Sequence, residues 1–298
     1  MRESIRQKLS LTLGGLVVGY LALCLLLRWG QTRLMFFPST TLKASPDLVG
    51  LAYEEVWLPM PEGQVHGWWI PATDQAPVLL YLHGNGSNLG DLVTRAKRFH
   101  QLGLSVLLID YRGYGRSQGP FPSEASVYAD AEAAWQYLTQ TRQISPDRIV
   151  VYGESIGGAV AIELAVRHPD AAAVIVESSF TSMRAMVARS IPEFLLPVDW
   201  LLTQQFDSLS KVRSLQVPIL LIHGTADTTI PATMSQELFA AAPSPKHLLL
   251  IPNANHDNVI QIGGKQYKQT VQQFIVRMTQ HLSSITSLWL SLGFVYEI

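Results

Sequence analysis

The sequence contains a single cysteine in 298 residues, and only 15% of its residues are charged. One thiol excludes a disulfide framework and any metal site built from several thiolates. The 22 basic and 23 acidic residues leave a formal net charge of −1, so no overall positive field attracts nucleic acid. Since 48% of the residues are hydrophobic, intrinsic disorder is excluded as well. The composition therefore predicts a globular protein with a sizeable core.

The lone cysteine, Cys24, lies in a long apolar run near the N-terminus. Leu9–Leu27 is 19 residues without a charge, enough to cross a hydrocarbon core of about 30 Å at about 1.5 Å per residue. Basic residues flank the run on both sides, and Trp29 is placed like an interfacial anchor. Residues 28–31 offer no small-x-small cleavage site, so an uncleaved membrane anchor over residues 1–33 is favoured over a cleaved signal peptide or a buried helix. Because the basic residues are nearly balanced, the side that holds the rest of the chain is left open, although the compact cluster before the run favours an inner N-terminus.

Beyond residue 33, short apolar runs alternate with longer helical segments, which is typical of an α/β fold with a mostly parallel sheet. The inner strands are continuously apolar, as expected when helices cover both faces of the sheet. The first two strands are joined by a short turn and predict an antiparallel hairpin at the sheet edge. One domain over residues 34–284 is the simplest account. The predicted strands are Tyr53–Leu58, Val65–Ile70, Val78–Leu82, Ser105–Ile109, Ile149–Tyr152, Ala173–Val176, Pro218–Ile222 and His247–Ile251. The predicted helices are Leu89–Leu102, Ser123–Thr141, Ile156–Arg167, Ala232–Ala241 and Lys265–Leu282.

About 40 residues between the sixth and seventh predicted strands break this alternation. They are rich in large apolar side chains, and Pro192 and Pro197 prevent a single long helix. Long connections in compact domains are often lids or binding elements, so residues 180–215 are predicted to form a short helical lid. The alternative is that ordinary helices pack there on the sheet. The candidate substrate-binding residues in this segment are Phe194, Leu195 and Trp200.

The strongest motif is Gly153-Glu154-Ser155-Ile156-Gly157, which fits the pattern G-x-S-x-G. It follows an apolar strand and opens an alanine-rich helical segment, and this strand–turn–helix context is what the motif requires. The glycines allow a sharp turn that directs the Oγ of Ser155 out of the sheet. The N–H of Ile156, at the start of the helix, would then point at a developing oxyanion. The alternative is a glycine-rich turn that carries no chemistry.

A serine needs a base to activate it and an acid to orient that base. Among eight histidines, His256 lies in a loop after the last strand, at the sheet edge where sites collect. Asp227 follows the preceding strand, so the order Ser155, Asp227, His256 matches that of α/β-hydrolases. Glu177, at the end of another strand, competes for the role of the acid. Asp227 could instead cap a helix that begins near Pro231.

The second oxyanion donor is expected from the backbone N–H near Asn85, in the loop after the third strand. This glycine-rich loop has a rival interpretation as a dinucleotide-binding turn, but Gly90 stands one residue too late for G-x-G-x-x-G. His83, in the same loop, is interpreted as a residue that stabilises the turn. The next loop, Asp110–Ser117, could cradle a phosphate between its glycines and basic residues, but a tight loop that passes close to the site is favoured.

The chain resembles the α/β-hydrolase superfamily in the order of its motifs. These motifs are the loop at Asn85, the loop Asp110–Ser117, the serine turn, and the segments at Asp227 and His256. More narrowly, the chain is similar to membrane-anchored α/β-hydrolase-domain proteins related to serine aminopeptidases and monoacylglycerol lipases. The resemblance covers roughly residues 34–282 and implies an α/β-hydrolase fold with an eight-stranded, mostly parallel sheet. It also implies these roles: nucleophile Ser155, acid Asp227, base His256, and backbone oxyanion donors at Asn85 and Ile156.

These expectations converge on a serine hydrolase that cleaves an ester, thioester or amide through an acyl-enzyme, with no metal or cofactor. The anchor and the apolar lid favour a lipophilic acyl substrate at a membrane. A peptidase similar to serine aminopeptidases and a non-catalytic binding protein on the same fold are the alternatives. The tail over residues 285–298 is strongly apolar but too short to span a membrane. Whether it docks on the domain, on a partner or on the bilayer is left open.

Overall fold

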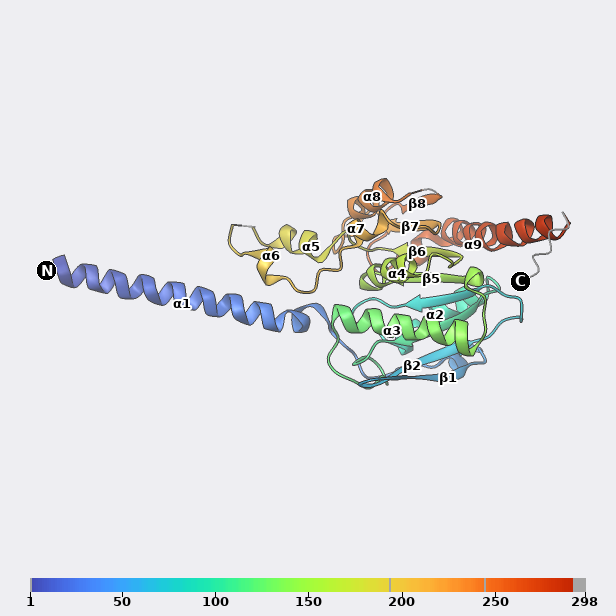
Figure 1. Cartoon of the computed structure of the whole chain (residues 1–298), viewed down its shortest axis with the longest axis horizontal. Coiled ribbons are helices and arrows are strands. Elements are labelled where there is room, and N and C mark those ends of the chain that lie inside the picture. Colours follow the sequence, from blue (N-terminus) through green and yellow to red (C-terminus); the bar gives the residue numbers. More distant parts are fainter. Residues whose placement is uncertain (1, 193, 244, 292–298) are drawn as a thin grey trace, which may run out of the picture.

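The structure is a computed structural model that describes the backbone of residues 2–192, 194–243 and 245–291, and the side chains of residues 6–279 with the same two gaps. A sheet of eight strands is sandwiched between helices, and a long N-terminal helix projects away from this body (Figure 1). The predicted α/β architecture is confirmed.

All eight predicted strands are present, with ends that differ from the prediction by no more than two residues. Their spatial order is β1-β2-β4-β3-β5-β6-β7-β8. The first two form the predicted antiparallel hairpin, β2 also runs antiparallel to β4, and all other neighbours are parallel. The strands are β1 (Glu54–Met60), β2 (Gly63–Ile70), β3 (Val78–Leu82), β4 (Ser105–Asp110), β5 (Ile149–Glu154), β6 (Ala173–Glu177), β7 (Ile219–Gly224) and β8 (Lys246–Ile251).

The sheet separates two hydrophobic cores. Along β3, Leu80 and Leu82 pack into the core beneath α3 and α4, whereas Leu79 and Tyr81 pack into the core beneath α2 and α9. Burial on both faces explains why the inner strands are continuously apolar. The helices are α1 (Arg2–Met35), α2 (Leu89–His100), α3 (Glu124–Gln136), α4 (Ile156–Arg167), α5 (Met183–Ser190), α6 (Val198–Leu201), α7 (Ser208–Val212), α8 (Ala232–Ala241) and α9 (Val259–Ser291). Shorter turns are η1 (Pro46–Val49), the π-helical η2 (Tyr137–Thr141) and η3 (Pro146–Arg148).

The last helix differs from its prediction at both ends. It begins at Val259, six residues before the predicted start, and the backbone breaks at Gly264, whose φ is +44°. A positive φ costs glycine little, so this residue allows two helical segments to join at an angle. The backbone of the predicted apolar tail is helical as far as Ser291, and residues 292–298 lie outside the described residues.

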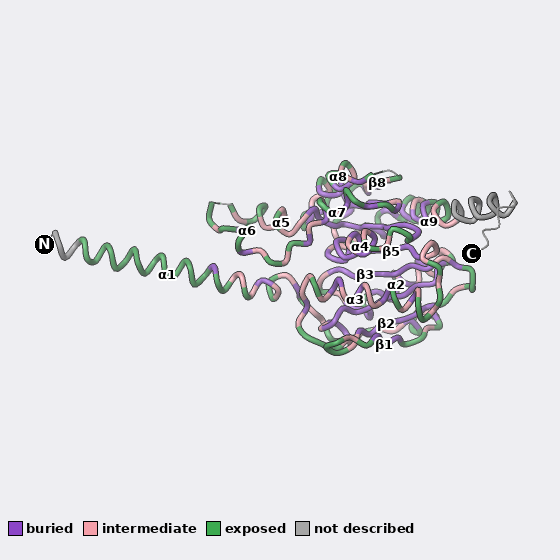
Figure 2. The backbone as a smooth tube through the Cα atoms, in the orientation of Figure 1, coloured by how far each residue is buried: buried purple, intermediate pink, exposed green. Residues whose placement is uncertain are grey.

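Helix α1 is mostly unburied by the rest of the chain. Its segment Arg6–Met35 is long and apolar enough to cross a membrane, and 6% of its most apolar part is buried. Figure 2 shows the exposed residues in an almost unbroken course along this helix. The low burial disfavours the core-helix interpretation of this segment.

Residues 180–215, here called the β6–β7 segment, carry the short helices α5, α6 and α7. Helix α5 ends at Ser190, shortly before Pro192, and α6 begins directly after Pro197, so the two prolines keep these helices separate. Figure 1 places α5 and α6 on the side of the body from which α1 projects, and α6 contacts α1 directly. The N-terminal helix thus meets a segment about 170 residues later in the chain at one end of the molecule.

Candidate active site

Ser155 stands at the sharp turn between β5 and α4. Its backbone φ is +53°, an unusual value for a residue with a side chain. The flanking glycines are required by close packing. A Cβ at Gly153 would lie 2.0 Å from the carbonyl oxygen of Gly157, and one at Gly157 would lie 2.2 Å from that of Leu82. The local sequence therefore permits a strained turn that lifts the serine side chain from the end of the sheet.

The structure brings Ser155, His256 and Asp227 together from the carboxyl ends of β5, β8 and β7. The Nε2 atom of His256 is 3.2 Å from the Oγ of Ser155, and its Nδ1 is 2.7 Å from Oδ2 of Asp227. If Nδ1 carries the proton and donates it to the carboxylate, the lone pair on Nε2 faces the serine hydroxyl. This is the geometry that proton transfer from serine to histidine requires.

Charge in the site is arranged to favour a protonated imidazole. Burial raises the pKa of Asp227, but hydrogen bonds from His223, His256 and the N–H of Ile230 outweigh it and hold this pKa well below its usual range. Burial lowers the pKa of His256, but the hydrogen bond and charge of Asp227 outweigh burial, so the net pKa is raised. The carboxylate is thus ionised and stabilises the imidazolium that would form on accepting the serine proton.

The geometry separates the two candidate acids. The Oδ1 of Asp227 accepts hydrogen bonds from the N–H groups of Thr229 at 2.9 Å and Ile230 at 2.8 Å, and these bonds stabilise the turn after β7. It is not the N-cap of α8, since that position is Pro231. Glu177 instead points into a buried cluster, where it accepts hydrogen bonds of 2.7 Å from both Tyr152 and Tyr267. Asp227 is therefore the carboxylate that meets the histidine.

Asn85 fixes the loop that passes beside the serine. The preceding residue, Gly84, is so close that an added Cβ would lie 3.2 Å from the Cβ of Ser155. The Oδ1 of Asn85 accepts the N–H of Phe37 at 2.9 Å and the hydroxyl of Tyr114 at 2.8 Å. Its Nδ2 donates to the carbonyl of Met35. The side chain is thus committed to holding the loop, which leaves an oxyanion role to its backbone.

The predicted partner of Asn85 is the N–H of Ile156. It is the first N–H of α4, and the first N–H groups of a helix have no partner within the helix. It also lies at the positive end of the helix dipole, where negative charge is stabilised.

Two polar residues near the serine were missed by sequence reasoning. The Oγ of Ser179 donates to the carbonyl of Ser155 at 2.8 Å, and the Nε2 of His223 lies 3.2 Å from Oδ2 of Asp227. Ser179 follows β6, and His223 lies near the carboxyl end of β7. The rule that functional sites collect at the carboxyl ends of parallel strands could therefore have found both residues. Both brace residues of the serine–histidine–aspartate arrangement.

The rival interpretations of the glycine-rich loops find little support. The two arginines of the loop Asp110–Ser117 are paired with carboxylates, Arg112 with Asp130 and Arg116 with Glu55, so neither is left to cradle a phosphate. Residues 41–43 cover the N-terminus of α2, where a Cβ on Gly90 would lie 2.7 Å from the backbone nitrogen of Lys43. A dinucleotide phosphate has no room there.

His83 behaves as a structural residue. It is fully buried, its Nδ1 bonds the carbonyl of Gly84 at 2.7 Å, and its ring lies 4.4 Å from that of Tyr111. Burial lowers its pKa to about 4, so the imidazole is neutral at physiological pH. These contacts agree with a role in stabilising the turn before Asn85.

The three candidate substrate-binding residues are exposed at the surface. Phe194 is 86% exposed, and Leu195 and Trp200 are each 50% exposed. The backbone of this region is attached to α1, since Tyr20 donates to the carbonyl of Leu195 at 3.1 Å. The guanidinium of Arg28 lies 4.9 Å from the ring centre of Trp200. Leu195 and Trp200 therefore contact the N-terminal helix, and their predicted role in substrate binding stays a prediction.

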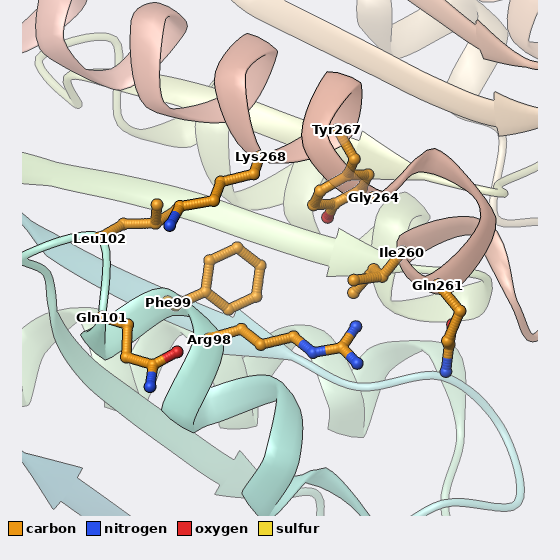
Figure 3. Close-up of a pocket in the computed structure, with 9 residues that line it drawn as sticks. All are labelled: Arg98, Phe99, Gln101, Leu102, Ile260, Gln261, Gly264, Tyr267 and Lys268. Carbon is orange, nitrogen blue, oxygen red and sulfur yellow. The ribbon is translucent and has the colours of Figure 1, made fainter.

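A separate pocket of about 280 Å³ lies between α2 and α9 (Figure 3). Phe99 forms its centre, with Arg98 and Lys268 on different sides of the ring. None of the predicted site residues lines it. Within the described part of the chain, no group of three or more His, Cys, Asp or Glu is arranged to hold a metal ion.

Comparison with known proteins gives matches over most of the chain. A family model described as serine aminopeptidase, S33, matches residues 73–210, and one described as PhoPQ-activated pathogenicity-related protein matches residues 182–287. An uncharacterised protein of Mycobacterium tuberculosis is 37% identical over 248 residues, which cover 82% of this chain and 87% of that protein. An α/β-hydrolase domain-containing protein of Arabidopsis thaliana is 28% identical and covers 88% of this chain and 92% of its own length.

Solved structures show the same fold. A Pyrococcus furiosus esterase superimposes with a TM-score of 0.66 at 22% identity, and the match covers 81% of this chain and 99% of the esterase. The sheet order, the strained serine turn and these relatives lead to one conclusion: the chain belongs to the α/β-hydrolase superfamily.

Proposed function

We propose that this protein is a serine hydrolase that cleaves an ester, thioester or amide of a lipophilic acyl substrate at a membrane. The observation that carries the proposal is the continuous hydrogen-bonded path from Asp227 through His256 to Ser155. The serine stands in a strained turn, and such strain is characteristic of functional positions. The family model described as serine aminopeptidase and the likeness to an esterase support hydrolytic chemistry.

The proposed reaction has two steps. The Oγ of Ser155 attacks the carbonyl carbon while Nε2 of His256 takes its proton, and the N–H groups of Asn85 and Ile156 stabilise the oxyanion. The tetrahedral intermediate collapses, the bond to the leaving group breaks, and the imidazolium returns its proton to the departing oxygen, sulfur or nitrogen. Water then attacks the acyl-serine with the same base, which releases the acid and restores the serine. Asp227 remains ionised throughout and orients the imidazole.

The membrane part of the proposal rests on surface chemistry. Helix α1 is long and apolar enough to span a bilayer, and large apolar side chains are exposed beside it. An exposed apolar surface next to a spanning helix favours a substrate that is itself held in the membrane. Ester or thioester lipids have this property, whereas short soluble peptides do not.

The test is hydrolysis by the full-length protein in detergent micelles. The panel contains nitrophenyl esters of increasing acyl length, an acyl thioester and aminoacyl amides. We expect turnover of acyl esters that rises with chain length, is lost in Ser155→Ala and persists in the control Ser145→Ala, an exposed serine whose side chain caps nothing. Turnover of aminoacyl amides alone would favour a peptidase, and no turnover by folded protein would favour a binding protein.

A further inference from the structure

A second cavity lies between α1 and the β6–β7 segment, and its walls are almost entirely apolar. Its volume is about 240 Å³. The lining residues come from α1 on one side and from α5, α6 and their connections on the other: Leu27, Gln31, Leu34, Met35, Met183, Val187, Ile191, Leu196, Val198, Leu201 and Leu202. Neither the predicted nucleophile nor its histidine is among them.

The single polar lining residue has no hydrogen-bonding capacity left for a ligand. The Nε2 of Gln31 donates to the carbonyls of Arg28 at 2.6 Å and Leu201 at 3.0 Å. Its Oε1 accepts the N–H groups of Thr203 at 2.9 Å and Gln204 at 3.1 Å. A glutamine amide has two donor hydrogens and two acceptor sites, and all four are used. The cavity therefore suits a ligand without polar groups, such as a hydrocarbon chain.

The contacts along α1 set the depth of the β6–β7 segment relative to a bilayer. If Leu9–Leu27 spans the hydrocarbon, Arg28 marks its edge, and the ring of Trp200 lies against that arginine. Tyr20, which bonds the carbonyl of Leu195, precedes Arg28 by eight residues, or about 12 Å along the helix. Half of the hydrocarbon core is about 15 Å thick, so the tip with Phe194 and Leu195 lies inside the near leaflet. This position explains why such large apolar side chains are exposed.

The cavity extends from that leaflet toward the serine. Leu27 lies at the edge of the hydrocarbon, whereas Met35, eight residues later, lies about 12 Å beyond it. The carbonyl of Met35 accepts a hydrogen bond from Asn85, the residue that follows Gly84 in the loop beside Ser155. On the opposite wall, Met183 is four residues from Ser179, which bonds the carbonyl of Ser155. Both walls therefore end at elements that hold the serine turn.

We infer that this cavity binds the acyl chain of a bilayer lipid, which enters sideways from the near leaflet between α1 and the β6–β7 segment. The N-terminal helix is then one wall of the substrate site in addition to a tether. The catalytic meaning of the site rests on the proposed serine hydrolase function, but acyl-chain binding can be tested without turnover.

The experiment uses the full-length Ser155→Ala protein in phosphatidylcholine nanodiscs that contain a phospholipid with a diazirine at the end of one acyl chain. After illumination, adducts are mapped by mass spectrometry. We expect adducts on Met35 or Met183, which line the cavity outside the hydrocarbon span. Adducts confined to residues 9–27 and 194–195 would overturn the inference, because they would mean that the chain stays in the bilayer.

Cavity-filling variants supply the control. Val187 lines the cavity from α5, and its exposed neighbour Ala188 does not. Val187→Trp is expected to reduce the adducts on Met35 and Met183 at least about tenfold, whereas Ala188→Trp leaves them unchanged. Leu34→Trp fills the same cavity from α1. It therefore tests the inference even if Val187→Trp prevents α5 from folding. Unchanged adducts in both filling variants would overturn the inference. Active-site labelling of the wild-type protein separately tests whether the serine is reactive, so the two proposals can fail independently.

Discussion

The turn that carries Ser155 and the β6–β7 segment differ in how strongly the rest of the molecule constrains them. At the turn, the N–H of Ser155 donates to the carbonyl of Glu177 at 2.9 Å, and neighbouring glycines touch other backbone atoms. In the β6–β7 segment, α5 contains no fully buried residue, and Phe194 is 86% exposed. This difference agrees with the proposed division of tasks, in which the sheet holds the reacting groups in place while α1, α5 and the exposed tip select what reaches them.

The largest predicted effect concerns the two carboxylates at strand ends. Asp227→Asn removes the acceptor that keeps the proton on Nδ1 of His256, so kcat for ester hydrolysis should fall about 10⁴-fold. Glu177→Gln, matched in chemistry but bonded to Tyr152 and Tyr267, should retain kcat within about tenfold. Steady-state kinetics measure both, and thermal melting confirms folding. Equal losses in the two variants would contradict the assignment of the acid.

The next effect concerns the loop of Asn85, which connects the turn of Ser155 with the end of α1. Asn85→Ala removes three hydrogen bonds, to Met35, Phe37 and Tyr114, and frees the loop beside Ser155. We expect kcat to fall about 10²-fold, comparable to the loss of one oxyanion donor, with little change in KM. Tyr114→Phe removes one of these bonds and should cost less than tenfold. If Asn85→Ala raises KM and spares kcat, the loop acts in substrate binding and not in oxyanion stabilisation.

A smaller effect is expected at the exposed tip. Replacing Phe194 and Leu195 together by serine removes apolar area from the proposed membrane contact. The apparent KM for a long-chain ester presented in vesicles should rise about tenfold, while kinetics with a short soluble ester stay unchanged. A matched double replacement at the exposed residues Ala188 and Arg189 tests for general disturbance of the segment. Equal effects on short and long substrates would mean that the tip supports the fold and not the membrane contact.

The smallest predicted effect is a shift in pH dependence. His256 must be neutral to accept the serine proton, so kcat/KM should fall as the pH drops through its pKa. This pKa is raised above its ordinary value of about 6.5, which places the midpoint of the acid limb above pH 6.5. Asp257 contributes to this raised pKa, so Asp257→Asn should move the midpoint to lower pH, whereas the remote Asp47→Asn should not. A midpoint below 6.5 in the wild-type protein would contradict the ion pair.

The same pKa shift predicts a stability profile. Because the folded pKa of His256 exceeds the unfolded value, its contribution to the free energy of unfolding is complete below about pH 6.5 and is lost as the pH rises through the folded pKa. Asp227 acts in the opposite direction, since its pKa is depressed: its contribution is present above about pH 4 and is lost on acidification. Thermal melts across the pH range measure both limbs.

Much of the site could be predicted because it depends on local patterns. The glycines around Ser155 are demanded by a turn of a few residues, and Asp227 and His256 each follow an apolar strand that is legible in the sequence. Parallel strands bring their carboxyl ends to one edge, so these positions meet without knowledge of any side-chain contact. The hairpin at the edge of the sheet could be predicted from an equally local feature, the short turn between its two strands.

The rest depended on contacts between distant segments. Gln31 bonds residues 201, 203 and 204, and Asn85 bonds Met35 and Phe37, and no local pattern encodes such pairings. The attachment of Leu195 and Trp200 to α1 could not be predicted for the same reason: Tyr20 bonds the carbonyl of Leu195, and Arg28 lies against the ring of Trp200. The position of the segment follows from its attachment to α1, which apolar composition alone does not reveal.

The most direct test of the central claim is labelling of the full-length, detergent-solubilised protein with a fluorophosphonate probe, with the adduct mapped by mass spectrometry. The account predicts a single labelled residue, Ser155, with labelling lost in Ser155→Ala and greatly slowed in Asp227→Asn. Failure of folded wild-type protein to react, or an adduct on another serine, would contradict the claim that Asp227 and His256 activate Ser155.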